Sequence, residues 1–400
     1  MDVWPVATVS NRLPHCQDVR MRALIALDKF KGSYSAIEIC AAVAELLNAQ
    51  GIECAIAPMA DGGEGTLDAL QSANFAQIEI STNDALGNPH DAKYGLNGNH
   101  AVIELANTCG MQSIAGQDLD PWRSGTYGLG QAAIWAMGVI DPKDPQFPRV
   151  PDAANPPTIT VAVGGSASVD GGLGFLQALG YEVKDQDGID VTPDATGLVA
   201  AASITPPSHA QEYHRIQWRV LVDVDNPALG PEGAAHTFGP QKGFTQEDCI
   251  ALEAALMNWT SLLAATFGKD QAQLASTPGA GAAGAITTAL TAALNAKIVN
   301  GSQEIADAVF IDEYLDDYCD VVVIGEGRLD DQTPHGKAPS EIARRARAHD
   351  LKVFAFVGQD AASDATKETL GITATVSLEA HGQNVFAAAN ELASHIAALP

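Results

Sequence analysis

The chain has 400 residues, of which 46% are hydrophobic and only 18% are charged, and its formal net charge is −27. This balance excludes intrinsic disorder and indicates a well-buried globular protein of about two or three domains. The excess of acidic residues would repel phosphate backbones and anionic lipids over most of the surface, which excludes a general nucleic-acid or membrane partner. The six cysteines stand far apart without zinc-type spacing, and no signal-like segment precedes them. We therefore expect free thiols and a cytoplasmic location.

The N-terminal part of the chain predicts two strands that each run into a polar loop. Residues 1–20 show no periodicity and are expected to form a poorly ordered extension. The apolar run at 23–27 predicts a strand, and Ser35 with Glu38 forms a capping box that starts a helix. A second strand over 53–58 runs into the glycine-rich loop that contains Asp61. Ligands of open α/β sheets bind at such strand ends.

The middle of the chain has a different pattern. Short strand-like pieces at 78–80, 92–96 and 101–105, separated by turn residues, predict a partly antiparallel or mixed sheet. A helix is expected over 124–137. The prolines of 141–157 exclude a helix interior or a central strand, so this segment is expected to be a surface loop.

The segment VAVGGSASVDGGLG at 161–174 reads as a strand, a glycine turn and the start of a helix. Free backbone N–H groups at such a turn, together with the helix dipole, can hold a phosphate or carboxylate. The later segment GAGAAG at 279–284 spells a dinucleotide fingerprint, but no strand precedes it. Close helix packing by small residues is therefore the favoured interpretation of that segment.

The C-terminal part returns to a regular α/β alternation. Thr245 and Asp248 predict the start of a long helix that ends near residue 267. From residue 320 onward we expect strands at 321–324, 353–357 and 373–377, with helices at 340–349 and 384–397.

These elements predict a two-domain α/β protein. The strands at both chain ends alternate regularly with helices. The simplest architecture is therefore one doubly wound parallel sheet built from both ends, with an inserted α/β domain that contains a mixed sheet. The predicted divisions are the extension 1–20, a first domain of 21–78 plus 303–400, and an inserted domain of 79–302. A cleft between the domains would bring the loops near Asp61, Gly165 and Gly325 face to face.

The polar loops combine acids, cations and glycines. The acids are Asp61, Glu64, Asp170, Asp223, Asp225, Glu326, Asp330 and Asp331, and the cations are Lys29, Lys31, Lys242, Arg328 and Lys337. Carboxylates would repel a bare phosphate, whereas magnesium can bridge the two kinds of oxygen. Phosphoryl transfer uses this combination, because the protein mainly positions groups and neutralises charge. The alternative for each acid is a turn or helix-cap role.

Taken together, seven motifs resemble those of the bacterial glycerate kinases of glucarate, galactarate and glyoxylate utilisation. In chain order they are DKFKGSYSA, MADGGEGT, VIELA, VGGSASVDGGLGFLQALG, DVDNPALGPEGAAHTFGPQKG, GAGAAG and GEGRLDDQTPHGKAP. The resemblance implies a flavodoxin-like α/β domain that carries a second α/β domain, with the active site between them. It also implies ATP- and magnesium-dependent phosphorylation of D-glycerate to 2-phosphoglycerate. Ser168 and Val169 depart from the family's Thr-Asn pair, so only a backbone role is expected there.

We assign the following hypothetical roles. Groups that would hold an anion are Gly164, Gly165 and Ser166 through their backbone amides, with Lys242 as a helper. Candidate magnesium ligands are Asp225, Glu326 and Asp330. Candidates for contact with the substrate carboxylate or the moving phosphate are Lys31 and Arg328. The candidate base is Asp61 or Asp170.

Two other function classes remain open at this stage. A non-catalytic two-domain sensor for a small hydroxy acid would explain the cleft and the cations but not the loop acids. A nicotinamide-dependent dehydrogenase would explain only the GAGAAG segment. The product isomer, the domain that holds the nucleotide and the choice between monomer and homodimer are also open.

Overall fold

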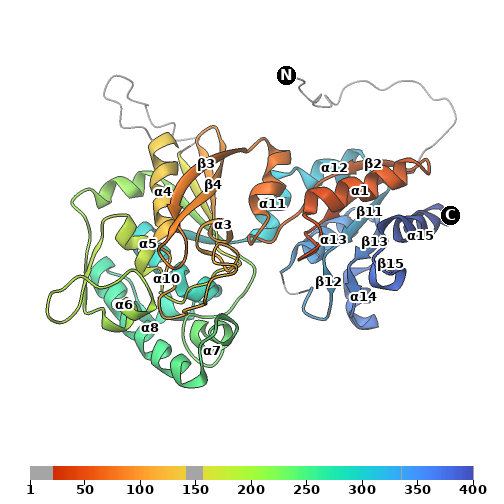
Figure 1. Ribbon diagram of the computed structural model, residues 1–400. Helices are drawn as coiled ribbons and strands as arrows, with labels where there is room; N and C mark the ends of the chain where they lie inside the picture. Colours follow the sequence, from red (N-terminus) through yellow and green to blue (C-terminus); the bar gives the residue numbers. More distant parts are fainter. Residues whose placement is uncertain (1–20, 141–155, 335, 400) are drawn as a thin grey trace, which may run out of the picture.

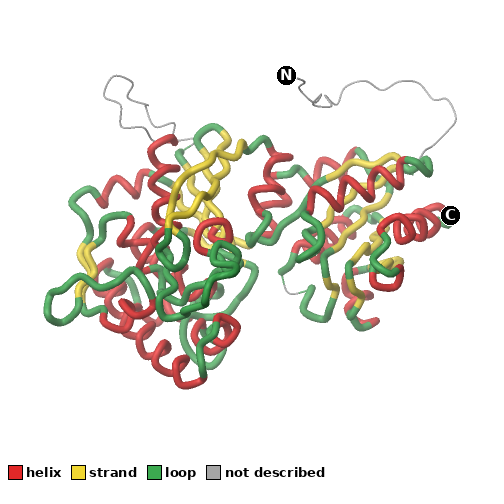
Figure 2. Tube along the Cα trace, viewed as in Figure 1, coloured by secondary structure: helices red, strands yellow, loops and turns green. Residues whose placement is uncertain are grey.

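The computed structural model describes residues 21–140, 156–334 and 336–399. The predicted extension 1–20 and most of the predicted proline-rich loop lie outside these residues. Within them the chain forms two lobes, each built around one β-sheet (Figure 1). The two sheets and the helices that cover them stand out in Figure 2.

The first sheet is parallel and contains strands from both ends of the chain. Its order is β15-β13-β11-β1-β2. The strands are β1 (Arg22–Leu27), β2 (Glu53–Ile56), β11 (Val321–Gly325), β13 (Lys352–Val357) and β15 (Ile372–Ser377). Counted along the chain, this is the 2-1-3-4-5 order of flavodoxin-like sheets. The predicted doubly wound sheet is therefore confirmed.

Helices cover both faces of this sheet because alternate residues of β1 point to opposite sides. Ala23, Ile25 and Leu27 pack with α1 (Ala36–Asn48) and α15 (Val385–Ala397). Leu24 and Ala26 pack on the other side. The helices of that side are α11 (Gly301–Ala308), α12 (Ile311–Asp317) and α13 (Ala338–Ala348), joined by α14 (Asp364–Leu370).

The second sheet is mixed, as predicted, with the order β10-β9-β6-β5-β4-β3. Its strands are β3 (Ala76–Asn83), β4 (Pro89–Asn97), β5 (His100–Glu104), β6 (Thr158–Ala162), β9 (Gln217–Val222) and β10 (Lys297–Asn300). The pairs β3–β4 and β4–β5 are antiparallel, and the remaining pairs are parallel. The exact domain boundaries at residues 78 and 303 remain a prediction.

The remaining elements surround the two sheets. The main helices of the mixed-sheet lobe are α4 (Tyr127–Ile140), α5 (Leu173–Ala178), α8 (Gln246–Phe267) and α10 (Ala282–Leu294). Shorter elements are α2 (Thr66–Ala69), α3 (Leu105–Cys109), α6 (Ala195–Ala200), α7 (Ala234–Phe238), α9 (Gln271–Ser276), β7 (Glu182–Lys184), β8 (Ser203–Thr205), β12 (Arg328–Leu329) and β14 (Gln359–Asp360). Four 3-10 helices complete the described chain: Leu70–Ala73, Ala210–Arg215, Pro240–Lys242 and Glu379–His381.

Several local predictions are confirmed. The capping boxes of Ser35 with Glu38 and of Thr245 with Asp248 both form. The cysteines of the described residues are free thiols: Cys40, Cys54, Cys109, Cys249 and Cys319. Helix α8 is long and apolar enough to cross a membrane by length and composition alone. Its residues Leu252, Leu256, Trp259 and Leu263 are nevertheless fully buried in the core of the mixed-sheet lobe, which is the usual setting of such a helix in a globular domain.

The two lobes meet through an unusually close approach of two glycine loops. The Gly164 N–H group, after β6, donates a hydrogen bond of 3.1 Å to the carbonyl of Gly62, after β2. A Cβ atom on Gly164 would lie only 2.5 Å from the Cα atom of Gly63, and a Cβ atom on Gly301 would clash with the carbonyl oxygen of Asp61. Only glycine allows this contact, which joins the carboxyl end of β6 to the loop that follows β2.

Replacing Gly164 with alanine should therefore lower the free energy of unfolding by about 1–3 kcal/mol, since the added methyl group must displace backbone. The control is Gly138→Ala in α4, where an added Cβ would meet no atom within 4 Å. That change should be neutral or stabilising by up to about 1 kcal/mol, because alanine favours helix. Urea unfolding of both variants measures the difference, and equal stabilities would contradict the described junction.

Candidate active site

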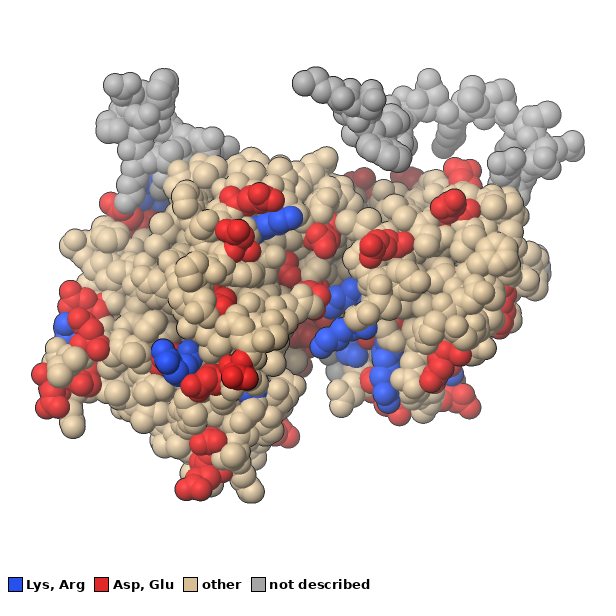
Figure 3. Space-filling model, viewed as in Figure 1, with Lys and Arg blue, Asp and Glu red and all other residues tan. Residues whose placement is uncertain are grey.

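A cavity of about 550 Å³ lies beside this junction. Its wall includes the backbone of Gly164, Gly165 and Ser166 from the loop after β6. Lys31 and Asp223 also line it, so it draws on the loops of both sheets. Figure 3 shows basic side chains gathered where the two lobes face each other. Of the three loops predicted to converge, the loop near Asp61, through Glu64, and the loop near Gly165 line this cavity, whereas no described residue of the loop near Gly325 does.

A second cavity of about 470 Å³ adjoins the first one. The two share four lining residues, namely Lys31, Glu64, Ala106 and Gln112. The second cavity adds Lys29, Lys93 and several hydroxyl and amide side chains. The pair of cavities has room for two small polar ligands next to each other.

Four carboxylates lie at the carboxyl ends of parallel strands around the cleft: Asp28 after β1, Asp61 after β2, Asp223 after β9 and Glu326 after β11. Burial raises the pKa of Asp28 to about 7; Lys29 opposes this shift, whereas Asp61 and Glu326 add to it. Burial also raises the pKa of Asp223 to about 6, and the charge of Asp61 contributes. These carboxylates therefore repel one another in a partly water-excluded site.

Magnesium fits this arrangement in one particular way. In the described part of the chain, no three His, Cys, Asp or Glu side chains come together as a ready-made metal site. Magnesium, however, is commonly bound by one or two carboxylates together with substrate phosphates and water. Asp223 suits that mode, because a cation beside it would offset the repulsion that the charge of Asp61 exerts on it.

The predicted ligand set of Asp225, Glu326 and Asp330 is not brought together in this way. Glu326 accepts hydrogen bonds from Thr333 at 2.6 Å and from Lys337 at 3.2 Å. Asp330 pairs with Arg328 at 3.5 Å. Asp225 is exposed on the loop after β9, in the mixed-sheet lobe. Partners within their own loop engage Glu326 and Asp330, which reduces their capacity to bind a metal.

The two predicted substrate-contacting cations differ in position. Lys31 lines both cavities and is exposed to them. Arg328 is 61% exposed and pairs with Asp330, and it does not line either cavity. The structure therefore places Lys31, but not Arg328, at the cleft.

Lys242 is more deeply embedded than expected for a helper at a phosphate site. It is 3% exposed, and its Nζ atom donates to Ser166 Oγ at 2.6 Å and to the Ser168 carbonyl at 2.7 Å. Burial lowers its pKa to about 7. Lys242 thus fixes the shape of the glycine loop and places a cation or a neutral amine directly behind it.

The GAGAAG segment contributes Ala282 and Ala283 to the wall of the first cavity. Ala283, which lines it, has a φ of 51°, and Ala285 has a φ of 66°. Such left-handed alanines are strained and occur where the surrounding structure enforces them. A Cβ atom on Gly284 would clash with the carbonyl of Ser168. The prediction that small residues serve close packing here is confirmed.

Asp170 lies outside the cavity lining and is completely buried. Its Oδ2 atom accepts from Thr126 N (2.8 Å), Thr126 Oγ1 (2.7 Å) and Gly174 N (3.2 Å), and its Oδ1 atom accepts from Gly172 N (3.1 Å). A carboxylate with four donors inside one lobe braces the turn that starts α5. This geometry argues against the hypothesis that Asp170 is the base.

Sequence reasoning assigned no individual role to several groups of the cleft, although it named Lys29 and Asp223 among the loop charges. Asp28 and Lys29 directly follow β1, and Asp223 directly follows β9. Their position at the carboxyl end of a parallel strand was a usable signal. Glu104, the last residue of β5, gave the same signal inside the motif VIELA. Which of these groups face one another depends on the contact between the two lobes, which the pattern of one chain does not specify.

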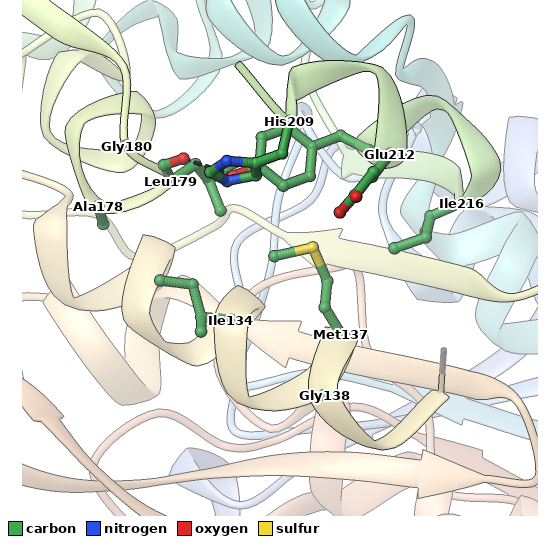
Figure 4. Close-up of a pocket in the computed structure, with 10 residues that line it drawn as sticks. Ile134, Met137, Gly138, Ala178, Leu179, Gly180, His209, Glu212 and Ile216 are labelled. Atoms are coloured by element: carbon green, nitrogen blue, oxygen red, sulfur yellow. Dashed lines mark hydrogen bonds between the residues drawn. The ribbon is translucent and has the colours of Figure 1, made fainter. Parts of the chain in front are cut away.

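A separate pocket of about 490 Å³ lies within the mixed-sheet lobe, and the cleft residues do not line it. Figure 4 shows Ile134 and Met137 of α4 opposite Leu179 and His209. His209 is bonded to the Tyr213 hydroxyl at 2.9 Å. The mainly apolar wall makes this pocket unsuitable for a phosphate group.

The chain is a two-lobed α/β protein with a polar cleft where the two lobes meet. Comparison with known proteins gives the family. The model of the glycerate kinase family matches residues 23–399, and the chain belongs to this family. It is therefore an enzyme of the phosphotransferase class.

Individual relatives agree with this assignment. The chain is 33% identical to a glycerate kinase of Halalkalibacterium halodurans, with 84% of each chain covered. It is 30% identical to glycerate 2-kinase of Escherichia coli, with 84% of this chain and 85% of the relative covered. A crystal structure assigned provisionally as glycerate kinase 2 of Salmonella typhimurium LT2 superimposes with a TM-score of 0.77 at 31% identity, covering 95% of this chain and 99% of that one.

The bonding of Asp170 leads to a prediction about stability. In the wild type both carboxylate oxygens of Asp170 accept hydrogen bonds from backbone N–H groups. In Asp170→Asn the NH₂ group would point at one of these N–H groups, which should lower the free energy of unfolding by about 1–3 kcal/mol. Asp187→Asn, on an exposed turn, is the matched control and should change stability by less than about 0.5 kcal/mol. Thermal unfolding measures the stability of both variants. If Asp170→Asn destabilises the protein no more than Asp187→Asn does, the bracing role is excluded.

Proposed function

We propose that the protein is an ATP- and magnesium-dependent kinase that phosphorylates D-glycerate at the 2-hydroxyl group to give 2-phosphoglycerate. The observation that carries the proposal is the cavity in which an amide-rich glycine loop, Lys31 and Asp223 meet. Amide and ammonium groups suit phosphate and carboxylate, and the carboxylates opposite them suit a magnesium ion and a proton acceptor. The printed names of the relatives support the choice of glycerate.

The binding part of the mechanism follows from the charges of the cleft. The backbone amides of Gly164 and Gly165, with Lys242 behind them, would hold phosphate oxygens of the nucleotide. Lys31, which lines both cavities, would neutralise the phosphate in transfer or the carboxylate of D-glycerate. Bound magnesium would supply charge neutralisation on the phosphates, with Asp223 as the protein ligand that lines the cavity.

The transfer itself needs one proton acceptor. Asp61 is our candidate: it does not line either cavity itself, but its charge acts on Asp223, which does, and its Oδ1 atom accepts from the Gly63 N–H group at 3.0 Å. The substrate hydroxyl oxygen would form a bond to the terminal phosphorus as the bond to the ADP oxygen breaks. The hydroxyl proton would pass to the Asp61 carboxylate.

The proposal includes a cytoplasmic location, and a monomer or homodimer remains the expected assembly. Those two statements follow from the sequence and not from the cleft. The alternative of a non-catalytic sensor for a small hydroxy acid would need the same cleft to bind without transfer.

A coupled ADP-release assay tests the proposal. With ATP, magnesium and D-glycerate, the protein should form ADP at a rate that disappears when the metal is chelated. Asp61→Asn should lower kcat on the order of a hundredfold to ten-thousandfold, because the hydroxyl loses its proton acceptor. Asp118→Asn, an exposed control, should leave kcat unchanged.

Two outcomes would contradict parts of the proposal. D-glycerate binding without metal-dependent ADP formation would favour the sensor. Phosphorus NMR of the product should give 2-phosphoglycerate, and 3-phosphoglycerate instead would overturn the choice of hydroxyl group.

A further inference from the structure

Glu104 connects the mixed-sheet lobe to the loop that carries Asp61. It is the last residue of β5 and is 4% exposed. Its Oε1 atom accepts from the Gly65 N–H group at 2.9 Å, and its Oε2 atom accepts from the Leu67 N–H group at 3.3 Å. Gly65 precedes α2, and its own position supplies no side-chain cap to this short helix. Glu104 therefore satisfies two amides that the helix leaves open.

The same loop is held at its other end by the glycine junction. The Gly62 carbonyl, directly after Asp61, accepts from the Gly164 N–H group, and Glu104 holds the amides of Gly65 and Leu67 further along the loop. Asp61 thus directly precedes a segment that is fastened at two points to the strand ends of the mixed sheet. A change at either fastening would move the carboxylate relative to the cavity.

The surroundings of Glu104 make its charge costly to maintain. Burial raises its pKa to about 7, the amides of Leu67 and Gly65 oppose the rise, Asp68 on α2 adds to it, and Lys29 opposes it. Because the folded-state pKa is raised, the stabilising contribution of this group is present at low pH and is lost as the pH rises through about 7. Above that pH the fold retains a buried carboxylate at an energetic cost.

We propose that Glu104 is a positioning residue, whose carboxylate fixes the Asp61–Thr66 loop against the mixed sheet so that Asp61 meets the substrate hydroxyl group. The ionised carboxylate offers an acceptor to both amides. A neutral carboxyl or an amide offers one good acceptor and turns a donor toward the second N–H group. The role of Asp61 in this inference rests on the proposed function, whereas the fastening of the loop does not.

Glu104→Gln keeps the size of the side chain and removes one acceptor. We expect kcat with D-glycerate to fall on the order of tenfold to a hundredfold, because a displacement of about 1 Å at a reacting group has this effect. Glu104 also lines the second cavity, but the amide keeps its size, so the KM values for ATP and D-glycerate should change by no more than about twofold. Glu79→Gln, on the exposed face of β3, is the matched control and should leave all three parameters unchanged.

Hydrogen exchange measures the fastening without any substrate. In Glu104→Gln the peptide that contains the Gly65 and Leu67 amides should exchange at least about tenfold faster, and peptides of β3 should not change.

The outcomes separate the two proposals. Unchanged kcat, or unchanged exchange at Gly65 and Leu67 in the variant, would overturn the positioning role. A lack of turnover by the wild type would overturn the proposed function, and the exchange measurement would still decide whether Glu104 fastens the loop.

Discussion

The close contact of two glycine backbones is the constraint on which the rest of this structure depends. Gly63 and Gly164 belong to different lobes, and any side chain on Gly164 would push the loops apart. With both Cβ atoms missing, the loop after β2 reaches the carboxyl ends of β6 and β9. Loops that usually serve one sheet therefore act together, which allows one cleft to draw amides and Asp223 from one lobe and Lys31 from the other.

The contact between the two glycine loops also brings charged groups of both lobes together in the cleft. The protein carries a formal net charge of −27, so an anionic substrate is attracted only where cations are held in place. Lys29 lies 3.9 Å from Asp28, and Lys337 lies 3.2 Å from Glu326. Each buried acid is thus partly compensated by a lysine of its own loop, while Lys31 remains exposed to both cavities. A bound metal ion would balance the remaining charge of the carboxylates, and a bound anion would balance the charge of Lys31.

Local pattern and chain order were sufficient to predict the parallel sheet from both chain ends, the mixed sheet and both capping boxes. The site was predictable at the level of loops, because glycines and acids after apolar runs indicate strand ends. Individual roles were less predictable. Asp170 has the sequence signature of a catalytic acid, yet Thr126, 44 residues away, supplies two of its hydrogen bonds. Contacts at such separation, and burial such as that of Lys242, arise from tertiary packing that a single sequence does not express.

The central claim is that loops of both sheets act on one pair of ligands. The most direct test is a crystal structure of the protein with ADP, D-glycerate and Mn²⁺, in which anomalous scattering locates the metal. The account predicts a metal bound to phosphate oxygens and Asp223, with ligand contacts to Lys31 from one lobe and to the Gly165 loop from the other. Ligands held by the loops of a single sheet, with the metal away from Asp223, would contradict it.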